Sequence, residues 1–306
     1  MTRPRPSQAD RDAPLRPLQP LRLPAGATDT HVHVLDPARF PFAADSPYHP
    51  VAAELGSAHE LAIMLDAAGV GRVVLVNPTS GYGDDNRCML DALERLGPRA
   101  RGIARVPLDV SPRRLDALAR RGVAGVRVDF VAKGLEPLND ASFMRLIGRL
   151  ADRDLVLDVQ SEGDQFVAIA RALAGTPVRV VVDHMSRPVP EHGVDAPGFR
   201  ALLGMADSGR VAVKLSGPMR CSHEAAPYRD LDPFQAALLR EFTARRLVWG
   251  SDWPFLRTDR RVDYGPMLAW LGRAVPRATD RRAILAATPA LWFGFAPASR
   301  AATVKD

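Results

Sequence analysis

The sequence Asp29-Thr30-His31-Val32-His33 opens the regularly patterned part of this 306-residue chain. Its alternation predicts a β-strand, and side chains two residues apart on a strand point to the same face. Asp29, His31 and His33 therefore share one face. Two neighbouring imidazoles are either metal ligands or proton carriers, because the neutral nitrogen suits Zn²⁺ and the ordinary pKa lies near neutral pH. A pair of structural, hydrogen-bonded histidines is the alternative.

Seven further short aliphatic stretches follow, and helical patterns lie between most of them. We predict strands over 29–33, 72–77, 101–106, 124–130, 155–160, 178–183, 211–216 and 247–252. We predict helices over about 57–68, 84–96, 112–121, 140–152, 163–174, 197–207 and 233–244. This alternation predicts an α/β protein of one domain, a (β/α)8 TIM barrel. The alternative is a doubly wound open sheet, but its usual glycine-rich turn after the first strand is absent.

Composition limits the partners that we expect. The barrel should span 26–296, between a disordered or surface-draped Pro/Arg-rich tail over 1–25 and a short tail over 297–306. The formal net charge is +6, but the basic residues are scattered and form no nucleic-acid-binding stripe. Two cysteines provide no disulfide framework, and no apolar run reaches the length of a membrane span. We therefore expect a cytoplasmic protein without nucleic-acid or membrane partners, and leave a homo-oligomer open.

Polar residues gather where the predicted strands end. In a TIM barrel the active site lies at the carboxyl ends of the strands, so these residues are candidates for it. They are His31, His33, Asn77, Arg127, Asp129, Asp158, Gln160, Asp183, His184, Lys214, Ser216 and Asp252. Ester hydrolysis needs a base for water and groups that polarise the carbonyl, and carboxylates and imidazoles can supply both.

Three segments that contain such residues together resemble a known family. They are 29–33, Val182-Asp183-His184-Met185-Ser186-Arg187-Pro188 and Trp249-Gly250-Ser251-Asp252-Trp253-Pro254. Over about 28–295 the chain resembles the amidohydrolase superfamily, in the "amidohydrolase 2" branch that includes 2-pyrone-4,6-dicarboxylate lactonase and several sugar-acid lactonases. The resemblance implies a catabolic hydrolase that opens a lactone, the cyclic ester of a small carboxylic or sugar acid.

The resemblance also implies catalytic roles for four residues: His31, His33, His184 and Asp252. Asp252 would activate water, and burial among apolar groups would raise its pKa into a useful range. The histidines would polarise the carbonyl, directly or through a metal. A turn-capping carboxylate is the alternative for Asp252, and a buried structural histidine is the alternative for His184.

The usual metal set of the superfamily is incomplete in this chain. The fifth strand, which ends Val156-Leu157-Asp158-Val159-Gln160, lacks the usual histidine, and the fourth strand lacks the lysine that bridges a binuclear site. We therefore expect that no cofactor is required. The alternative is one divalent metal, Zn or Mn, held by His31, His33, His184 and Asp252, with Asp158 able to complete the set.

Arginines are the expected binders of an anionic or sugar-acid substrate, because a guanidinium grips a carboxylate with two hydrogen bonds. Arg127 and Arg220 match arginines that bind carboxylates in the pyrone dicarboxylate lactonase; for Arg127 a buried pair with Asp129 or Asp158 is equally open. Three further substrate contacts are expected from Lys133, Asn77 and Asp158. Lys133 stands in place of an arginine and Asp158 in place of a tyrosine, so pyrone dicarboxylate itself fits poorly. Lys214 either faces the site or lies in a buried ion pair.

Two other functions stay open at this point. One is a Zn-dependent decarboxylase of the same superfamily, which the Lys214-Leu215-Ser216 strand end disfavours because a histidine is usual there. The other is a barrel that has lost activity and only binds a ligand. A barrel that only binds a ligand would turn over no lactone, and replacing Asp252 would have no effect.

Overall fold

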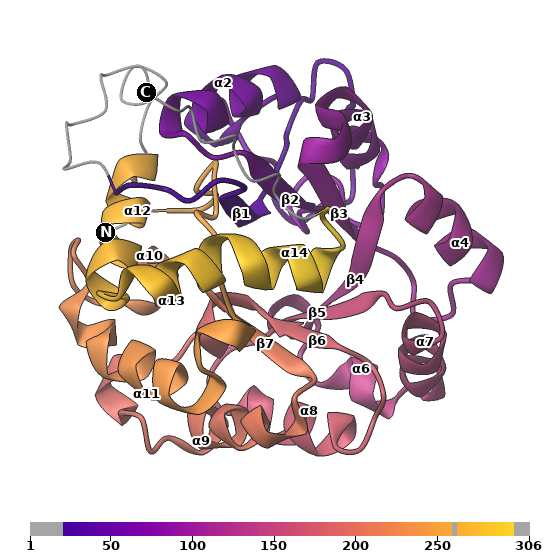
Figure 1. Ribbon diagram of the computed structural model, residues 1–306. Coiled ribbons are helices and arrows are strands. Elements are labelled where there is room, and N and C mark those ends of the chain that lie inside the picture. Colours follow the sequence, from indigo (N-terminus) through magenta and orange to yellow (C-terminus); the bar gives the residue numbers. More distant parts are fainter. Residues whose placement is uncertain (1–20, 259–261, 297–306) are drawn as a thin grey trace.

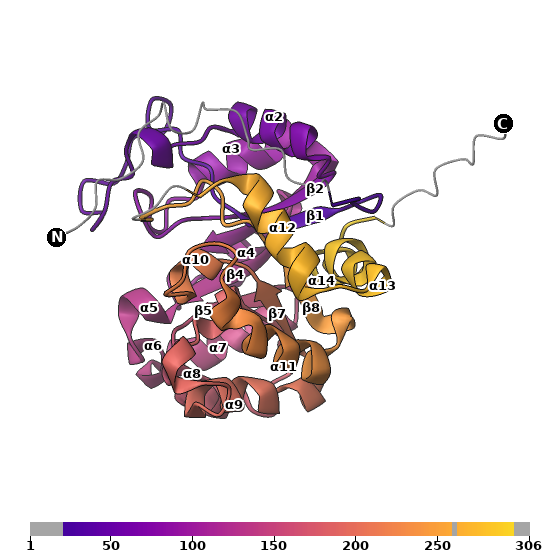
Figure 2. The same ribbon diagram turned by 90° about the vertical axis from the view of Figure 1, so that its left-hand side faces the viewer.

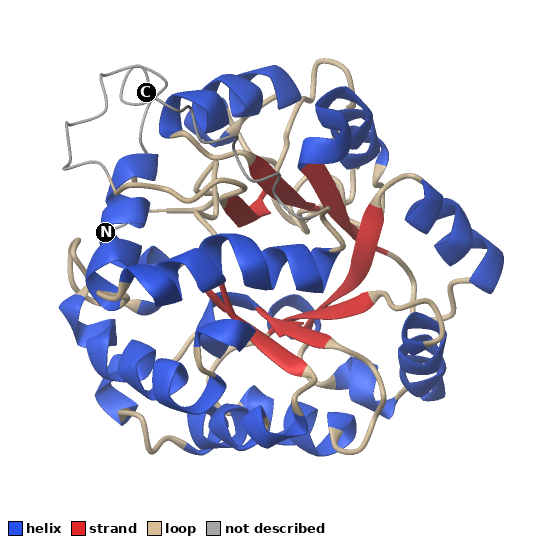
Figure 3. Cartoon of the chain, in the orientation of Figure 1, coloured by secondary structure: helices blue, strands red, loops and turns tan. Residues whose placement is uncertain are grey.

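The computed structural model describes residues 21–258 and 262–296, and within them eight parallel strands form a single sheet in chain order. The strands are β1 (Thr28–Val32), β2 (Arg72–Val76), β3 (Ala100–Arg105), β4 (Val123–Asp129), β5 (Val156–Gln160), β6 (Val180–Val182), β7 (Val211–Leu215) and β8 (Leu247–Trp249). Figures 1 and 3 show the strands at the centre and the helices around them. The predicted (β/α)8 barrel is confirmed, and every predicted strand is present with ends shifted by at most a few residues.

The first and last strands meet, which nearly closes the sheet on itself. Thr30 Oγ1 donates to the backbone oxygen of Trp249 at 2.8 Å. Beyond β8 the backbone N–H of Asp252 donates to His31 at 2.9 Å, and that of His33 donates to Trp253 at 2.8 Å. The segment that carries Asp252 is therefore fixed by main-chain hydrogen bonds to the segment that carries both histidines.

Helices cover the outside of the barrel and both of its ends. They are α2 (Ala58–Ala68), α3 (Arg87–Leu96), α4 (Pro112–Arg120), α5 (Phe130–Lys133), α6 (Glu136–Asn139), α7 (Ala141–Ala151), α8 (Gln165–Leu173), α9 (Pro197–Gly204), α10 (Pro218–Cys221), α11 (Asp232–Phe242), α12 (Tyr264–Ala274), α13 (Ala278–Arg282) and α14 (Thr288–Phe293). The seven predicted helices are present. The short α5, α6 and α10 and the three helices after β8 were not predicted, since they are brief or interrupted by proline.

Local sequence signals explain where the helices begin. Ser57 Oγ accepts a hydrogen bond from the backbone N–H of Glu60, whose carboxylate accepts one from the backbone N–H of Ser57, so α2 starts with a capping box. Ser111 caps α4 by accepting from the backbone N–H of Arg114, with Pro112 at the first helical position. The loops that lead into α2 and α4 are therefore anchored where these helices begin, at Ser57 and Ser111.

The two ends of the barrel differ in construction. Figure 2 shows the short helices α5, α6 and α10 at one end and α13 and α14 at the other. At the α14 end, inward-facing aliphatic side chains pack against Trp292, Phe293 and Phe295. Their strand partners are Val74, Val76, Ile103, Val156, Val181, Ala212 and Val248. An apolar plug therefore seals this end, as an α/β barrel whose interior is a packed core requires.

Three arginines hold the plug in place: Arg72 and Arg101 on strands, and Arg179 just before β6. Arg101 donates to the backbone oxygen of Gly294 at 2.8 Å, and Arg72 donates to that of Ala296 at 2.6 Å. Arg179 reaches the oxygen of Trp292 at 3.3 Å. These contacts satisfy carbonyls that the end of α14 leaves without helical partners.

Most of the predicted tails, 1–20 and 297–306, lies outside the described residues. Among the helices that are described, none is both long enough and apolar enough to cross a bilayer.

Candidate active site

A buried cluster of four charged side chains underlies the open end of the barrel. Arg127 on β4 donates to Asp158 at 2.9 Å and to Asp183 at 2.5 Å. Lys214 on β7 contacts the same two carboxylates, at 2.6 Å from Asp158 and 2.8 Å from Asp183. We name these residues the charged quartet. Its two cations and two anions balance, which is the condition for burying charge at tolerable cost.

His31 lies directly against the charged quartet. Its Nδ1 is 3.1 Å from Asp183 Oδ1 and 3.3 Å from Lys214 Nζ, and its Nε2 is 3.2 Å from Arg127 Nη2. The pKa of His31 lies well below its ordinary value, because burial and the adjacent Lys214 and Arg127 cations disfavour a further proton. His31 is therefore neutral, with Nδ1–H donated to Asp183 and the Nε2 lone pair facing the open end.

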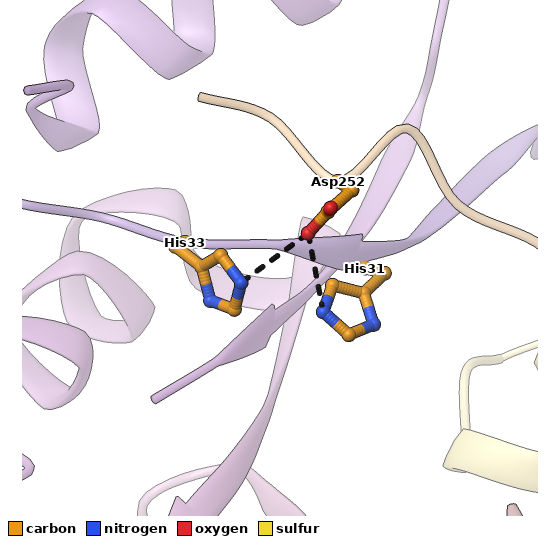
Figure 4. Close-up of side chains that lie close together, drawn as sticks. All are labelled: His31, His33 and Asp252. Carbon is orange, nitrogen blue, oxygen red and sulfur yellow. Dashed lines mark ion pairs between the residues drawn. The ribbon is translucent and has the colours of Figure 1, made fainter. Parts of the chain in front are cut away.

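Asp252 approaches His31 of β1 and His33, just beyond that strand, from the segment after β8 (Figure 4). Its Oδ1 is 3.6 Å from His31 Nε2 and 3.5 Å from His33 Nε2, while its Oδ2 accepts a hydrogen bond from Arg220 Nε. Gly250 makes this approach feasible, because a Cβ there would lie 2.5 Å from the Cβ of His31. Asp252 has a φ of 68°, a left-handed conformation that its hydrogen bond to His31 holds in place.

The orientation of the His33 ring decides what His31, His33 and Asp252 can bind together. Its Nδ1 lies 2.7 Å from the backbone oxygen of Val76, so the proton of a neutral ring is on Nδ1 and Nε2 carries a lone pair. Three acceptor atoms, Nε2 of His31, Nε2 of His33 and Oδ1 of Asp252, then lie within 4.8 Å of one another. A proton or a metal cation fits among them, and Asp252 Oδ1 has no other partner in the described chain. The residues present could therefore hold a metal ion.

The fourth predicted catalytic residue, His184, stands in an unusual turn. His184, Met185, Ser186 and Arg187 all have positive φ, from 43° to 59°, so the chain makes a left-handed turn after β6. The ring of His184 lies 4.6 Å from that of His31, and its Nδ1 is 2.9 Å from Ser216 Oγ. Gly217 leaves room for it, since a Cβ there would meet Nδ1 at 2.5 Å. Burial lowers the pKa of His184 to about 3, so it is neutral.

The expected rise in the pKa of Asp252 is wrong. Burial does raise it, but the guanidinium of Arg220 is the largest opposing contribution, and the pKa lies well below its ordinary value. Asp252 is therefore an ionised carboxylate at neutral pH. Its Oδ1 is left without a hydrogen-bond partner among the described residues.

Above these residues a cavity of about 970 Å³ opens at the carboxyl ends of the strands. Seven of the predicted site residues line it: His31, His33, His184, Asp252, Arg127, Arg220 and Gln160. Arg187 and Arg257 add further positive charge, and Thr79 and Ser80 add uncharged polar groups. The active-site location expected for a TIM barrel thus carries the predicted histidines, the carboxylate and an excess of arginine.

The comparisons with known proteins agree with this arrangement. A family model described as amidohydrolase matches residues 28–295. This chain belongs to the amidohydrolase family. Among its relatives, a 4-sulfomuconolactone hydrolase of Rhizobium radiobacter is 34% identical over 89% of this chain and 91% of the relative. A 2-pyrone-4,6-dicarboxylate hydrolase of Comamonas testosteroni is 34% identical over 88% of this chain and 90% of the relative.

A solved structure supports the same assignment. A candidate 2-pyrone-4,6-dicarboxylic acid hydrolase from Pseudomonas putida matches with a TM-score of 0.81 and 29% identity, over 89% of this chain and 99% of the other. The resemblance drawn from the three sequence segments is therefore confirmed. The relatives are hydrolases named for lactone substrates.

Three of the substrate contacts expected in this amidohydrolase lie away from the cavity wall. The amide of Asn77 donates to the backbone oxygens of Gly83 and Asp85, and so orders a loop instead. Asp158 is fully buried in the charged quartet. Lys133 ends α5 with its residue exposed, outside the cavity lining. For Arg127, the alternative of a buried pair with Asp158 is realised, although the residue also borders the cavity.

Arg187 is the amidohydrolase site residue that sequence reasoning missed. It lines the cavity, and its Nε is buried without a hydrogen-bond partner in the described chain. Its nearest carboxylate is Glu162, at 3.8 Å from Nη1. No property of a single sequence separates Arg187 from the other arginines, because its direction depends on the left-handed turn after His184.

Proposed function

We propose that this amidohydrolase hydrolyses a lactone of a small organic acid that carries at least one negative charge. The observation that carries the proposal is the convergence of His31, His33 and Asp252 on one point at the floor of an arginine-lined cavity. A base beside a cationic pocket suits attack by water on an anionic ester. The lactone-hydrolysing relatives make the cyclic ester the favoured class.

Asp252 is the proposed base. Its ionised, unpartnered Oδ1 takes a proton from water, and the resulting hydroxide attacks the carbonyl carbon of the lactone. His33 lies 3.5 Å from the same oxygen and can share that proton. Collapse of the tetrahedral intermediate breaks the bond between the carbonyl carbon and the ring oxygen, and the proton passes to that oxygen as it leaves. The product is the open hydroxy acid or its enol form.

Donors for the developing oxyanion come from the other side of the site. The Nδ1–H protons of neutral His31 and His33 point at Asp183 and Val76, so neither ring donates into the cavity in that state. We assign this role to His184 in the tautomer in which Nδ1 accepts from Ser216 Oγ, since the proton is then on Nε2. Carbonyl polarisation is therefore assigned to His184 and to one Nη group of Arg220, in place of all three histidines, and the other Nη group is left for the substrate anion.

Arg187 and Arg220 are the proposed binders of the substrate anion. Arg220 uses Nε for Asp252, and its two Nη groups have no hydrogen bond to the described residues. Arg187 has an unpartnered buried Nε. A carboxylate or sulfonate supplies the acceptors that these guanidinium groups lack, and each charge-assisted hydrogen bond contributes about 1.5–3 kcal/mol.

A panel of lactones tests this function. The purified protein is mixed with lactones of mono- and dicarboxylic acids, lactones of sugar acids, and their neutral methyl esters, and acid release is followed with a pH indicator. We expect turnover of an anionic lactone and little turnover of its ester. Turnover of no member would contradict the lactonase proposal, and release of CO₂ from an aromatic acid would favour the decarboxylase.

We further propose that turnover needs no tightly bound divalent metal. A metal held by His31, His33 and Asp252 would polarise the carbonyl and lower the pKa of water. Against that, His31 Nε2 already accepts a hydrogen bond from Arg127, and Asp252 is already paired with Arg220. These adjacent cations oppose the binding of a dication at the same atoms.

Chelation is therefore expected to leave activity unchanged. The measurement is elemental analysis of the purified protein beside activity before and after dialysis against a chelator. One equivalent of zinc or manganese per chain, with activity lost on removal and restored on return, would contradict the expectation. His31, His33 and Asp252 would then be ligands rather than proton carriers.

The pH dependence follows from the shifted groups. Asp252 is ionised because its pKa is low, and His184 and His31 are neutral because theirs are low, so none of the three titrates near neutral pH. Asp29, which accepts the backbone N–H of His31, has its pKa raised by burial to about 6 and sets the lower limit. We expect kcat/KM to change less than about threefold between about pH 6.5 and 8.5. A tenfold loss per pH unit on the acid side of that range would instead identify a histidine base.

A further inference from the structure

Ser216 directly follows β7, and its side chain lies against the ring of His184. Its Oγ is 2.9 Å from His184 Nδ1, and this is the one hydrogen bond that the hydroxyl makes within the described chain. Ser216 is fully buried, so bulk water does not reach it. The hydrogen bonding of this hydroxyl is therefore settled with a single ring nitrogen.

A serine hydroxyl can either donate or accept, so the pair has two arrangements. If Nδ1–H donated to Oγ, the hydroxyl hydrogen of Ser216 would be buried without an acceptor in residues 21–258 and 262–296. If Oγ–H donates to Nδ1, both atoms are satisfied, which avoids the cost of an unpaired buried donor. Because the pKa of His184 is about 3, its ring is neutral and carries one proton, which is then on Nε2.

The two other histidines of the site have pure acceptors at the same ring position. His31 Nδ1 is 3.1 Å from Asp183 Oδ1, and His33 Nδ1 is 2.7 Å from the backbone oxygen of Val76. Carboxylate and carbonyl oxygens only accept, so these rings keep the proton on Nδ1 and present a lone pair at Nε2. Among the three rings, His184 has a hydroxyl there instead. The partner at Nδ1 thus decides whether an imidazole of this site accepts or donates.

The ring of His184 is also fixed in position. Gly217 has a φ of 59°, and a Cβ there would lie 2.5 Å from His184 Nδ1, so the ring packs directly against the backbone after Ser216. The backbone oxygen of His184 accepts from Cys221 Sγ at 3.7 Å. On the opposite side of the ring, Nε2 has no partner among the described residues and is not sealed off from the cavity that His184 lines.

We infer that Ser216 is a positioning residue whose hydroxyl fixes the tautomer of His184, so that Nε2–H donates to the lactone carbonyl. The inference rests on the proposed function, in which that donor stabilises the oxyanion. In the opposite tautomer, a lone pair on Nε2 would face the growing negative charge and repel it. Ser216 therefore acts on the reaction through His184 and without touching the substrate.

NMR spectroscopy reads the tautomer directly and needs no substrate. The seven histidines are isotope-labelled at nitrogen, and the ring signals of His184 are those missing from His184→Gln. A ring nitrogen that carries a proton and one that carries a lone pair resonate at well-separated frequencies. We expect the proton on Nε2 in the wild type and a mixture of both tautomers in Ser216→Ala, because no partner at Nδ1 then favours either one.

Turnover of a lactone from the panel gives the second readout. We expect Ser216→Ala to lower kcat about 10-fold and to change KM less than about threefold, since the carbonyl oxygen gains its charge only in the transition state. Removing an oxyanion donor outright costs about 100-fold or more. The loss is smaller here because part of the His184 rings still carry the proton on Nε2.

Ser161→Ala is the matched control. Ser161 is also a fully buried serine just after a strand, but its hydroxyl pairs with Ser186 at 2.8 Å rather than with a histidine. This variant should keep the wild-type tautomer and kcat, although it also loses a buried hydrogen bond.

A wild-type proton on Nδ1 of His184 would overturn the inference, and this result needs no variant that folds. An unmixed Nε2–H tautomer in Ser216→Ala would overturn it as well, and so would equal losses of kcat in Ser216→Ala and Ser161→Ala. Absence of turnover with every lactone refutes the proposed function instead, and the NMR signals then decide the tautomer by themselves.

Discussion

Asp252→Asn is expected to lower kcat on any lactone that the protein hydrolyses by about 1000-fold or more, within the range that a positioned general base contributes. Asparagine has nearly the same shape, and its oxygen still accepts from Arg220, so the fold should persist. What is lost is the only ionised oxygen that faces both His31 and His33 without a partner of its own in the described chain. The measurement is kcat after subtraction of spontaneous hydrolysis.

Asp66→Asn is a matched control, since Asp66 is an exposed carboxylate on α2 that pairs with Arg99 at 2.7 Å. It should behave as the wild type. A barrel that only binds ligands would show no difference between wild type and Asp252→Asn. Wild-type turnover in Asp252→Asn would remove Asp252 from the chemistry and leave it a structural partner of Arg220.

Lys214→Met is expected to lower the free energy of unfolding by about 3–5 kcal/mol, the usual result of removing one partner from a buried ion pair. Lys214 is fully buried against Asp158 and Asp183. Without its ammonium group, Arg127 alone faces two buried carboxylates, and one negative charge has no counterpart. The measurement is the denaturant midpoint together with the slope of the unfolding transition.

The double variant Lys214→Met/Asp158→Asn tests the reason for that loss. It removes one cation and one anion from the charged quartet, so it should recover a large part of the lost stability. Lys133→Met, at an exposed lysine, provides the control for the substitution itself. If the single variant were as stable as the wild type, charge balance would not be what holds this part of the barrel together.

The barrel could be predicted from the sequence because strand and helix patterns are local. A run such as Arg72–Val76 is buried on both faces and carries its aliphatic character in a few adjacent residues. His31, His33 and Asp252 could be predicted as a group because each stands at or just beyond the end of a predicted strand. Their closeness then follows from the architecture of the barrel alone.

The direction of individual side chains could not be predicted. Asn77 stands at the end of a strand, but a loop after β2 supplies Gly83 and Asp85 as better partners than the cavity. Arg187 enters the site only because the backbone after His184 is left-handed, which no residue type in that stretch requires. The pKa of Asp252 depends on Arg220, whose pairing is tertiary, so burial alone gave the wrong sign.

The plug built from α14 has a consequence for how the protein is made. Its aromatic side chains pack against the inward-facing side chains of strands that leave the ribosome much earlier. Arg72, Arg101 and Arg179 donate hydrogen bonds to its backbone oxygens and to those just after it. More than 200 residues separate β1 from β8. At about 5–20 residues per second, translation keeps the nascent sheet open for roughly 10–40 s, with an unpaired strand edge and an unfilled core. Assembly of this barrel is therefore completed late, only after α14 has been synthesised, and the unpaired strand edge is exposed to aggregation until then.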